Sequence, residues 1–170
     1  MKTGTKLILS AIVMLVSASG AFAQATASAT ATATIVTPIS ITKTVDMNFG
    51  NVAVQASTAG TAVLTPAGSR TSTGGVTLPA TTGTVTAASF TVNGQGAYTY
   101  AITLPSAALT ITSGGNTMTV TAFTSTPSAT GALTAGTQTL NVGATLNVGA
   151  GQASGVYVSG TPFDVTVNYN

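Results

Sequence analysis

The chain has 170 residues, of which only 4% are charged: four lysines and arginines and two acidic residues, with no histidine and no cysteine. Most enzymatic chemistry needs a side chain that transfers protons, acts as a nucleophile or binds a metal, and these residue types are nearly absent. The composition therefore predicts a protein that is not an enzyme and that uses no metal and no other cofactor.

The first 23 residues have the three parts of a secretory signal peptide. Lys2 and Lys6 make the start basic, an apolar segment covers most of residues 7–16, and Ala21-Phe22-Ala23 forms a cleavage site. The apolar segment is too short to span a bilayer as a permanent helix. We expect cleavage after Ala23, export to the periplasm or the extracellular surface, and no membrane span in the processed chain.

The same two lysines account for the formal charge of +2. In the rest of the chain, two basic residues balance two acidic ones, so no basic surface is expected that could bind nucleic acid. Charge repulsion protects such a nearly neutral protein only weakly from association, which favours a protein that assembles.

Residues 25–49 alternate between apolar and polar side chains, a pattern that predicts an extended chain with one apolar face. Pro38 divides this segment, because proline cannot donate a hydrogen bond to a sheet and occurs at sheet edges. We expect an amino-terminal extended arm over residues 24–36 and a single domain over residues 37–170, which begins with a strand near residues 39–45.

Two hairpins are predicted further along the chain. The first joins residues 84–93 to residues 97–104 through Gly94-Gln95-Gly96, a loop typical of hairpins. The second joins residues 109–112 to residues 117–122. In both, the expected register puts apolar side chains on one face. The expected pairs are Val92–Tyr98, Phe90–Tyr100, Ala88–Ile102, Ile111–Met118 and Leu109–Val120.

The sequence Thr-Leu-Asn-Val-Gly-Ala occurs twice in succession over residues 139–150. A hairpin at Gly143-Ala144 would pair Asn141 with Leu146 and so mix polar with apolar side chains. We predict one long strand instead, kinked at Gly143. Its apolar face would consist of Leu140, Val142, Ala144, Leu146 and Val148.

Residues after 23 show no helical periodicity, and many short alternating strands are separated by glycine-rich turns. This pattern is typical of an antiparallel β-sandwich. We therefore predict an all-β fold of the immunoglobulin-like or pilin-like kind. Its last strand would direct one row of apolar side chains inward, namely Phe163, Val165, Val167 and Tyr169.

The few candidate chemical groups favour structural roles. Asp46 and Asp164 lie on polar faces of alternating strands, and we interpret them as solvated carboxylates that form weak surface pairs with Lys43 and Arg70. Tyr98 and Tyr100 share the register of Ile102, which favours packing in the core over stacking on a carbohydrate.

Two stretches carry a resemblance to a known family. Residues 39–52 include Asp46-Met47-Asn48-Phe49-Gly50-Asn51-Val52, and residues 142–169 include Gly149-Ala150-Gly151-Gln152 and Gly155-Val156-Tyr157. Together they resemble a family of small secreted bacterial proteins known as a domain of unknown function, DUF4402. The resemblance covers the chain after the leader and implies no activity.

The carboxyl-terminal part also resembles subunits of chaperone–usher pili, which end in an alternating strand with a penultimate aromatic residue, here Tyr169. In such pilins an amino-terminal arm of one subunit completes the sandwich of the next. The resemblance implies a structural protein of the fimbrium that self-associates or joins other envelope subunits, with a periplasmic chaperone as partner. The candidate donor-strand residues are Ala31, Ala33, Ile35, Ile39 and Ile41.

A second hypothesis is a self-contained secreted binding module, an adhesin or a glycan- or matrix-binding sandwich whose arm pairs within its own subunit. Its ligand contacts would then lie in residues 55–82 or 124–136, the two polar stretches that contain glycine.

Overall fold

The structure, a computed structural model, describes residues 24–170, so the predicted signal peptide over residues 1–23 lies outside it. Residues 35–170 form one compact unit. Residues 24–34 form no strand, and all of them are exposed. The described residues contain the strands β1 to β13 and no helix, and all pairings between these strands are antiparallel. The predicted all-β antiparallel sandwich is therefore confirmed.

The largest sheet has eight strands. Its main path runs β1-β6-β11-β9-β8-β12. Beside this path β3 pairs with β11, and β4 pairs with β3. The bounds are β1 (Ser40–Val45), β3 (Gly60–Leu64), β4 (Arg70–Gly74), β6 (Ala88–Asn93), β8 (Leu109–Ser113), β9 (Asn116–Thr126), β11 (Thr137–Val148) and β12 (Val158–Ser159).

Two smaller sheets complete the fold. A three-stranded sheet has the order β10-β7-β13, and a two-stranded sheet joins β2 to β5. Their bounds are β2 (Ala53–Val54), β5 (Val76–Thr77), β7 (Thr99–Thr103), β10 (Thr130–Ala132) and β13 (Thr166–Tyr169).

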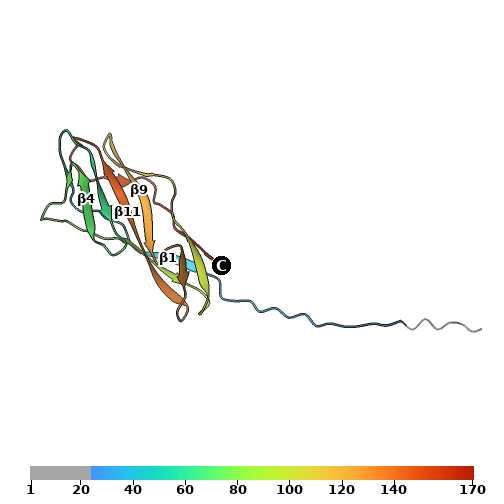
Figure 1. Cartoon of the computed structure of the whole chain (residues 1–170). Helices are drawn as coiled ribbons and strands as arrows, with labels where there is room; N and C mark the ends of the chain where they lie inside the picture. The colour runs from blue at the N-terminus through green and yellow to red at the C-terminus, as the bar shows by residue number, and fades with distance from the viewer. Residues whose placement is uncertain (1–23) are drawn as a thin grey trace, which may run out of the picture. The chain divides into compact units, whose positions relative to one another are not determined.

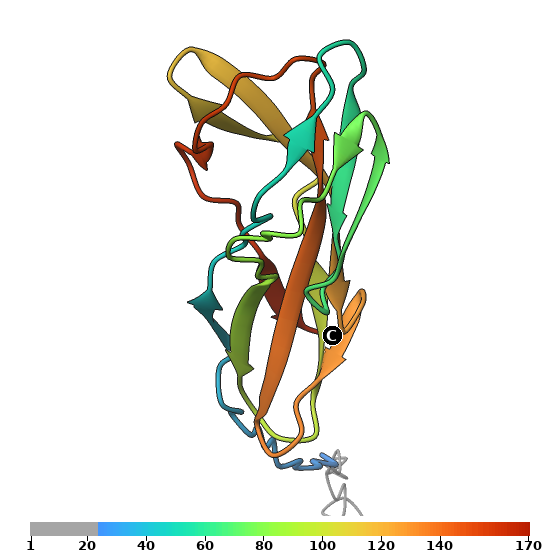
Figure 2. The same ribbon diagram turned by 90° about the vertical axis from the view of Figure 1, so that its left-hand side faces the viewer.

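The longest strand, β11, connects the two halves of the large sheet (Figure 1). Along one edge it pairs first with β6, up to Val142, and then with β3, from Ala144 onward. Along its other edge it pairs with β9. Figure 2 shows β11 in orange-red along the length of the sheet. The predicted single strand is confirmed, and the pairing with β9 shifts register just after Gly143, where a kink was expected.

The inner face of β11 contributes to two core clusters. Leu140 and Val142 belong to a cluster with Phe90 and Tyr100, whereas Leu146 belongs to a cluster with Val120. Alternation places all five predicted apolar residues of this strand on the buried side. Burying each leucine or valine side chain contributes about 1.5–3 kcal/mol to stability. Because β11 supplies such side chains to both clusters, it stabilises both of them.

The hairpin predicted over residues 109–122 is confirmed in its register, since Leu109 pairs with Val120 and Ile111 with Met118 in the β8–β9 ladder. The hairpin predicted over residues 84–104 is wrong. There β6 pairs with β1 and β11, whereas β7 pairs with β10 and β13 in the other sheet. The loop between β6 and β7 thus carries the chain from one sheet to the other.

Phe90, Val92 and Tyr100 nevertheless bury their side chains in the same cluster, as their shared apolar face predicted. They reach it from two facing sheets instead of from paired neighbours. Residues on two facing sheets and residues on one hairpin produce the same alternation, so the pattern alone does not distinguish the two arrangements.

Candidate functional site

The four charged residues of the part of the chain that the structure describes have different environments. Lys43 and Asp46 form an exposed ion pair, with 2.6 Å between Nζ and Oδ1. Exposed pairs of this kind contribute little to stability, as the sequence predicted. Within residues 24–170, no group of three histidine, cysteine, aspartate or glutamate side chains could bind a metal ion.

Arg70 has a different role from the surface pair that was expected. It opens β4 and is half-buried, and its Nη1 donates hydrogen bonds to the carbonyls of Phe49 and Asn51, the latter at 2.9 Å. Asp164 is exposed, and the ion pair of Lys43 is the one found in the described residues. Arg70 therefore fastens the segment before β2 to the sheet.

The structure divides the candidate donor-strand residues into two sets. Ala31 and Ala33 are exposed, and the side chain of Ile35 is 91% exposed. Ile41 instead lies in β1, opposite Val92 of the same chain, and Ile39 packs against the same core cluster. The exposed set ends where the chain joins the sandwich.

The four candidate residues of the carboxyl-terminal strand all direct their side chains inward. Val167 is buried, and Phe163, Val165 and Tyr169 pack against its cluster. Phe163 makes aromatic contacts with Phe90 and Phe123, at centroid distances of 6.4 Å and 5.0 Å. Only Val167 and Tyr169 belong to β13, which pairs with β7.

The penultimate residue, Tyr169, joins three distant segments. Its hydroxyl donates a hydrogen bond to the carbonyl of Thr37 at 2.7 Å and accepts one from the amide of Gln95 at 2.6 Å. The amide and the hydroxyl of Thr37 in turn donate to Oε1 of Gln95, each at 3.3 Å. We call Thr37, Gln95 and Tyr169 the clasp. It fixes the point from which the preceding residues leave the sandwich.

Tyr98, just before β7, and Tyr100, within β7, have separate environments. Tyr100 is buried and donates a hydrogen bond to Oε1 of Gln138 at 2.8 Å, and burial raises the pKa of its phenol. Tyr98 is 43% exposed and packs edge-on against Tyr169, with 5.6 Å between ring centroids. Core packing is thus confirmed for Tyr100, whereas Tyr98 lies beside the clasp.

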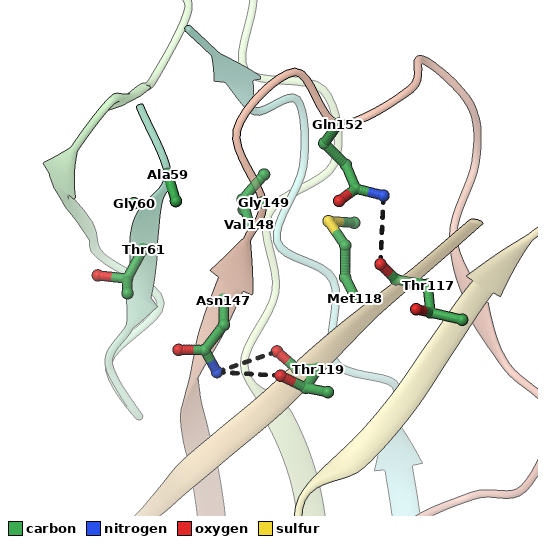
Figure 3. A pocket seen from close by; sticks show the side chains of 10 residues that line it. All are labelled: Ala59, Gly60, Thr61, Thr117, Met118, Thr119, Asn147, Val148, Gly149 and Gln152. Carbon is green, nitrogen blue, oxygen red and sulfur yellow. Dashed lines mark hydrogen bonds between the residues drawn. The ribbon is translucent and has the colours of Figure 1, made fainter. Parts of the chain in front are cut away.

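A pocket of about 540 Å³ opens where β11 ends, between β3 and β9 (Figure 3). Polar side chains from four segments meet there. Nδ2 of Asn147 donates to the carbonyl of Thr119 at 3.2 Å, and Nε2 of Gln152 donates to the carbonyl of Thr117 at 3.2 Å. Thr61 lies across the pocket on β3.

The pocket offers hydroxyl and amide groups without charge, beside the apolar side chains of Met118 and Val148. Such a lining suits a neutral ligand rich in hydroxyl groups, but it holds no acid, base or nucleophile activated by a neighbour. Of the two stretches predicted to carry ligand contacts, residues 55–82 contribute to it and residues 124–136 do not.

No helix of the described residues is long and apolar enough to cross a membrane. A family model described as a domain of unknown function, DUF4402, matches residues 39–169. No curated protein and no solved structure matches the chain significantly.

Proposed function

The chain belongs to the family of a domain of unknown function, DUF4402, and we propose that it is a non-enzymatic structural protein of the bacterial envelope, a pilin-like subunit. Subunits would assemble by β-strand addition, in which the arm of one copy pairs with an open sheet edge of another. The basic and apolar leader supports export to the periplasm, and the fimbrium is the location that a pilin-like subunit would have.

One observation carries this proposal. Residues 25–34 alternate alanine with threonine or serine, a pattern that suits a strand, yet all of them are exposed and none belongs to a strand. A segment with strand patterning and no strand partner is suited to add to a sheet of another molecule. Alanines bury little apolar area, so Ile35 would be the main anchor of the exposed set.

A self-contained binding module is the second candidate, and the pocket at the end of β11 favours it. Asn147, Gln152 and Thr61 could hydrogen-bond a glycan there. A glycan array with the wild-type protein and with Asn147→Ala tests this function. Hits that the substitution removes support it, and an array without hits contradicts it.

Two variants of the arm test the assembly proposal. Ala31→Pro with Ala33→Pro removes two amide donors that strand addition needs. Ala31→Val with Ala33→Val raises strand propensity and apolar area. Both positions are exposed, so the melting temperature of the sandwich should stay unchanged in both variants.

The protein is produced with its own leader, and its mass distribution is measured by sedimentation velocity over a range of concentrations. We expect oligomers for the wild type, fewer for the proline variant and more for the valine variant. A wild type that stays monomeric at high concentration, with both variants indistinguishable from it, would contradict assembly through the arm.

A further inference from the structure

We propose that the acceptor for the arm is the edge formed by β8 and β12, and that a second copy of this chain supplies the arm. We call residues 108–112 and 156–161 together the acceptor edge. This inference rests on the proposed strand addition. It specifies which edge accepts the arm and how neighbouring copies are arranged.

The first support is the exposure of two valines on this edge. Val156 is 82% exposed and Val158 is 61% exposed, although both are β-branched residues on an alternating segment. Val158 pairs with the exposed Thr112, whereas Ser159 pairs with Ile111, which packs against the core. The segment that leads into β12 therefore directs Val156 and Val158 to solvent, whereas Ser159 lies on the core side.

The second support is an incomplete ladder. Only two residue pairs join β8 to β12, and the ladder stops before Leu109 and Thr110. A cavity of about 320 Å³ opens at this point between β8 and residues Gly160 and Thr161. Leu109 lines the cavity and is only partly buried. An added strand would find backbone groups to pair with and apolar surface to cover.

Three other sheet edges, those of β13, β4 and β1, offer less. On β13, Thr166 and Asn168 are exposed, while Val167 and Tyr169 already pack against the core. β4 carries threonine and serine on its exposed positions. The edge of β1 has one partly exposed valine, Val45, beside the Lys43–Asp46 ion pair, and charge protects a strand edge from pairing.

The third support is the position of the clasp. It lies too far from the acceptor edge of the same copy for Ile35 to pair there. The clasp lies beside the start of β11, because Gln95 follows Asn93, which pairs with Thr137. The acceptor edge lies beside the end of β11, because β8 pairs with the part of β9 that meets Leu146 and Asn147. The length of β11 at about 3.3 Å per residue separates the two by about 35 Å.

Ile35 lies two residues before the clasped Thr37, so it can reach only about 7 Å from that point. Its partner on the acceptor edge must therefore belong to another copy. Because the donor and the acceptor are different surfaces at opposite ends of the sandwich, the contact is heterologous, and an oligomer that does not close into a ring keeps one free donor and one free acceptor. Copies would then join head to tail into an open chain.

Cysteine cross-linking tests the edge, since the chain has no cysteine of its own. One version carries Ile35→Cys, and a second version, enlarged by a tag, carries Val158→Cys. In the matched control the tagged version carries Asn168→Cys in place of Val158→Cys. Asn168 lies on β13 and is also exposed. The two versions are mixed under a mild oxidant, and the mixed disulfide dimer is followed on a non-reducing gel.

We expect the Val158→Cys version to cross-link at least about tenfold faster than the Asn168→Cys version, because pairing raises the effective concentration of the two thiols. Faster cross-linking at Asn168→Cys, or equal rates at both positions, would overturn the acceptor edge. Strand addition itself would still stand if the proline and valine variants of the arm change the mass distribution as expected.

A second measurement does not depend on cysteine geometry. Val156→Thr with Val158→Thr removes the exposed apolar pair and keeps a β-branched shape. We expect it to shift assembly to higher concentration without changing the melting temperature. Val45→Thr on the edge of β1 is the control and should leave assembly unchanged. Assembly that is weakened by Val45→Thr, or that is not weakened by the double variant of Val156 and Val158, would overturn the proposal.

Discussion

The hydroxyl of Tyr169 donates a hydrogen bond to the carbonyl of Thr37, 2.7 Å away and 132 positions earlier in the chain. The penultimate residue thus holds the first residues of the sandwich in place. Ile35, two residues before Thr37, is 91% exposed. The boundary between packed and exposed chain therefore lies beside this contact, which holds Thr37 at the start of the sandwich.

Tyr169→Phe should loosen this boundary. The phenylalanine keeps the ring contact with Tyr98 but loses the hydrogen bonds to Thr37 and Gln95. We expect a loss of stability of about 1–2 kcal/mol and faster hydrogen exchange at the amide of Gln95. Urea unfolding measures the stability, and amide hydrogen exchange measures the protection of Gln95.

Tyr157→Phe is the matched control, because Tyr157 also uses its hydroxyl twice, with Gln152 and Ala153, in a segment outside the clasp. It should leave the exchange of Gln95 unchanged. Equal protection of that amide in wild type and Tyr169→Phe would show that the hydroxyl does not hold the clasp.

Gly131→Ala should destabilise the three-stranded sheet. A methyl group at Gly131 on β10 would contact the ring of Tyr100 and come within 2.5 Å of Oε1 of Gln138. Tyr100 is fully buried and hydrogen-bonded to Gln138, so neither group can move freely. We expect a loss of about 1–3 kcal/mol, as for other overpacked cores.

Thermal unfolding measures this loss. Gly115→Ala is the control, since a methyl group at Gly115 in the β8–β9 turn meets no atom within 4 Å. If both alanine variants melt at the same temperature, the close packing of Gly131 against Tyr100 is wrong.

Tyr100 should also make stability depend on alkaline pH. Burial raises the pKa of its phenol above the usual value of about 10, so between the unfolded and folded pKa the unfolded state binds fewer protons than the folded state. This contribution is complete below pH 10 and is lost as the pH rises through the folded pKa. Tyr100→Phe should remove that part of the decline.

The comparison is made by urea unfolding of both proteins at several pH values between 8 and 12. The variant should be less stable at pH 8, because it loses the hydrogen bond to Gln138, and the difference should shrink at higher pH. A difference that stays constant over this range would contradict the raised pKa.

The hairpins show which part of the fold the sequence could predict. The β8–β9 register follows from a four-residue turn and from the alternation beside it, both of which are local. The loop at residues 94–96 has a similar composition, yet the amide of Gly94 bonds to Gly136 and the amide of Ala97 bonds to Leu133. These partners are about forty positions away, and no local pattern reveals them.

The same distinction applies to the candidate site. Alternation placed Phe163, Val165, Val167 and Tyr169 on one inward face, and the structure agrees. It could not reveal that the hydroxyl of Tyr169 bonds to Thr37 and Gln95, because nothing in the sequence around a tyrosine indicates which distant residues its hydroxyl will meet. The outward direction of Val156 and Val158 was also missed, because alternation predicts two faces of a strand but does not tell which of them is covered.

The tandem repeat offers a direct test of how position in the fold decides the role of identical sequences. Gly143 and Gly149 occupy the same place in the two copies of Thr-Leu-Asn-Val-Gly-Ala. Gly143 is buried, and a methyl group there would lie 2.6 Å from the carbonyl carbon of Thr65 and 2.8 Å from the nitrogen of Pro66. Gly149 is exposed, and its methyl group would meet only Oε1 of Gln152, at 3.1 Å.

Gly143→Ala should therefore lower stability by about 1–3 kcal/mol, because backbone atoms of the segment after β3 cannot yield as a flexible side chain can. Gly149→Ala should stay within about 0.5 kcal/mol of the wild type, as is usual for surface changes. Urea unfolding of the two variants, with the same amino-acid change in the same hexapeptide, measures the difference. Equal losses would mean that β11 does not approach residues 64–66 at Gly143, and that the two halves of the large sheet join in another way.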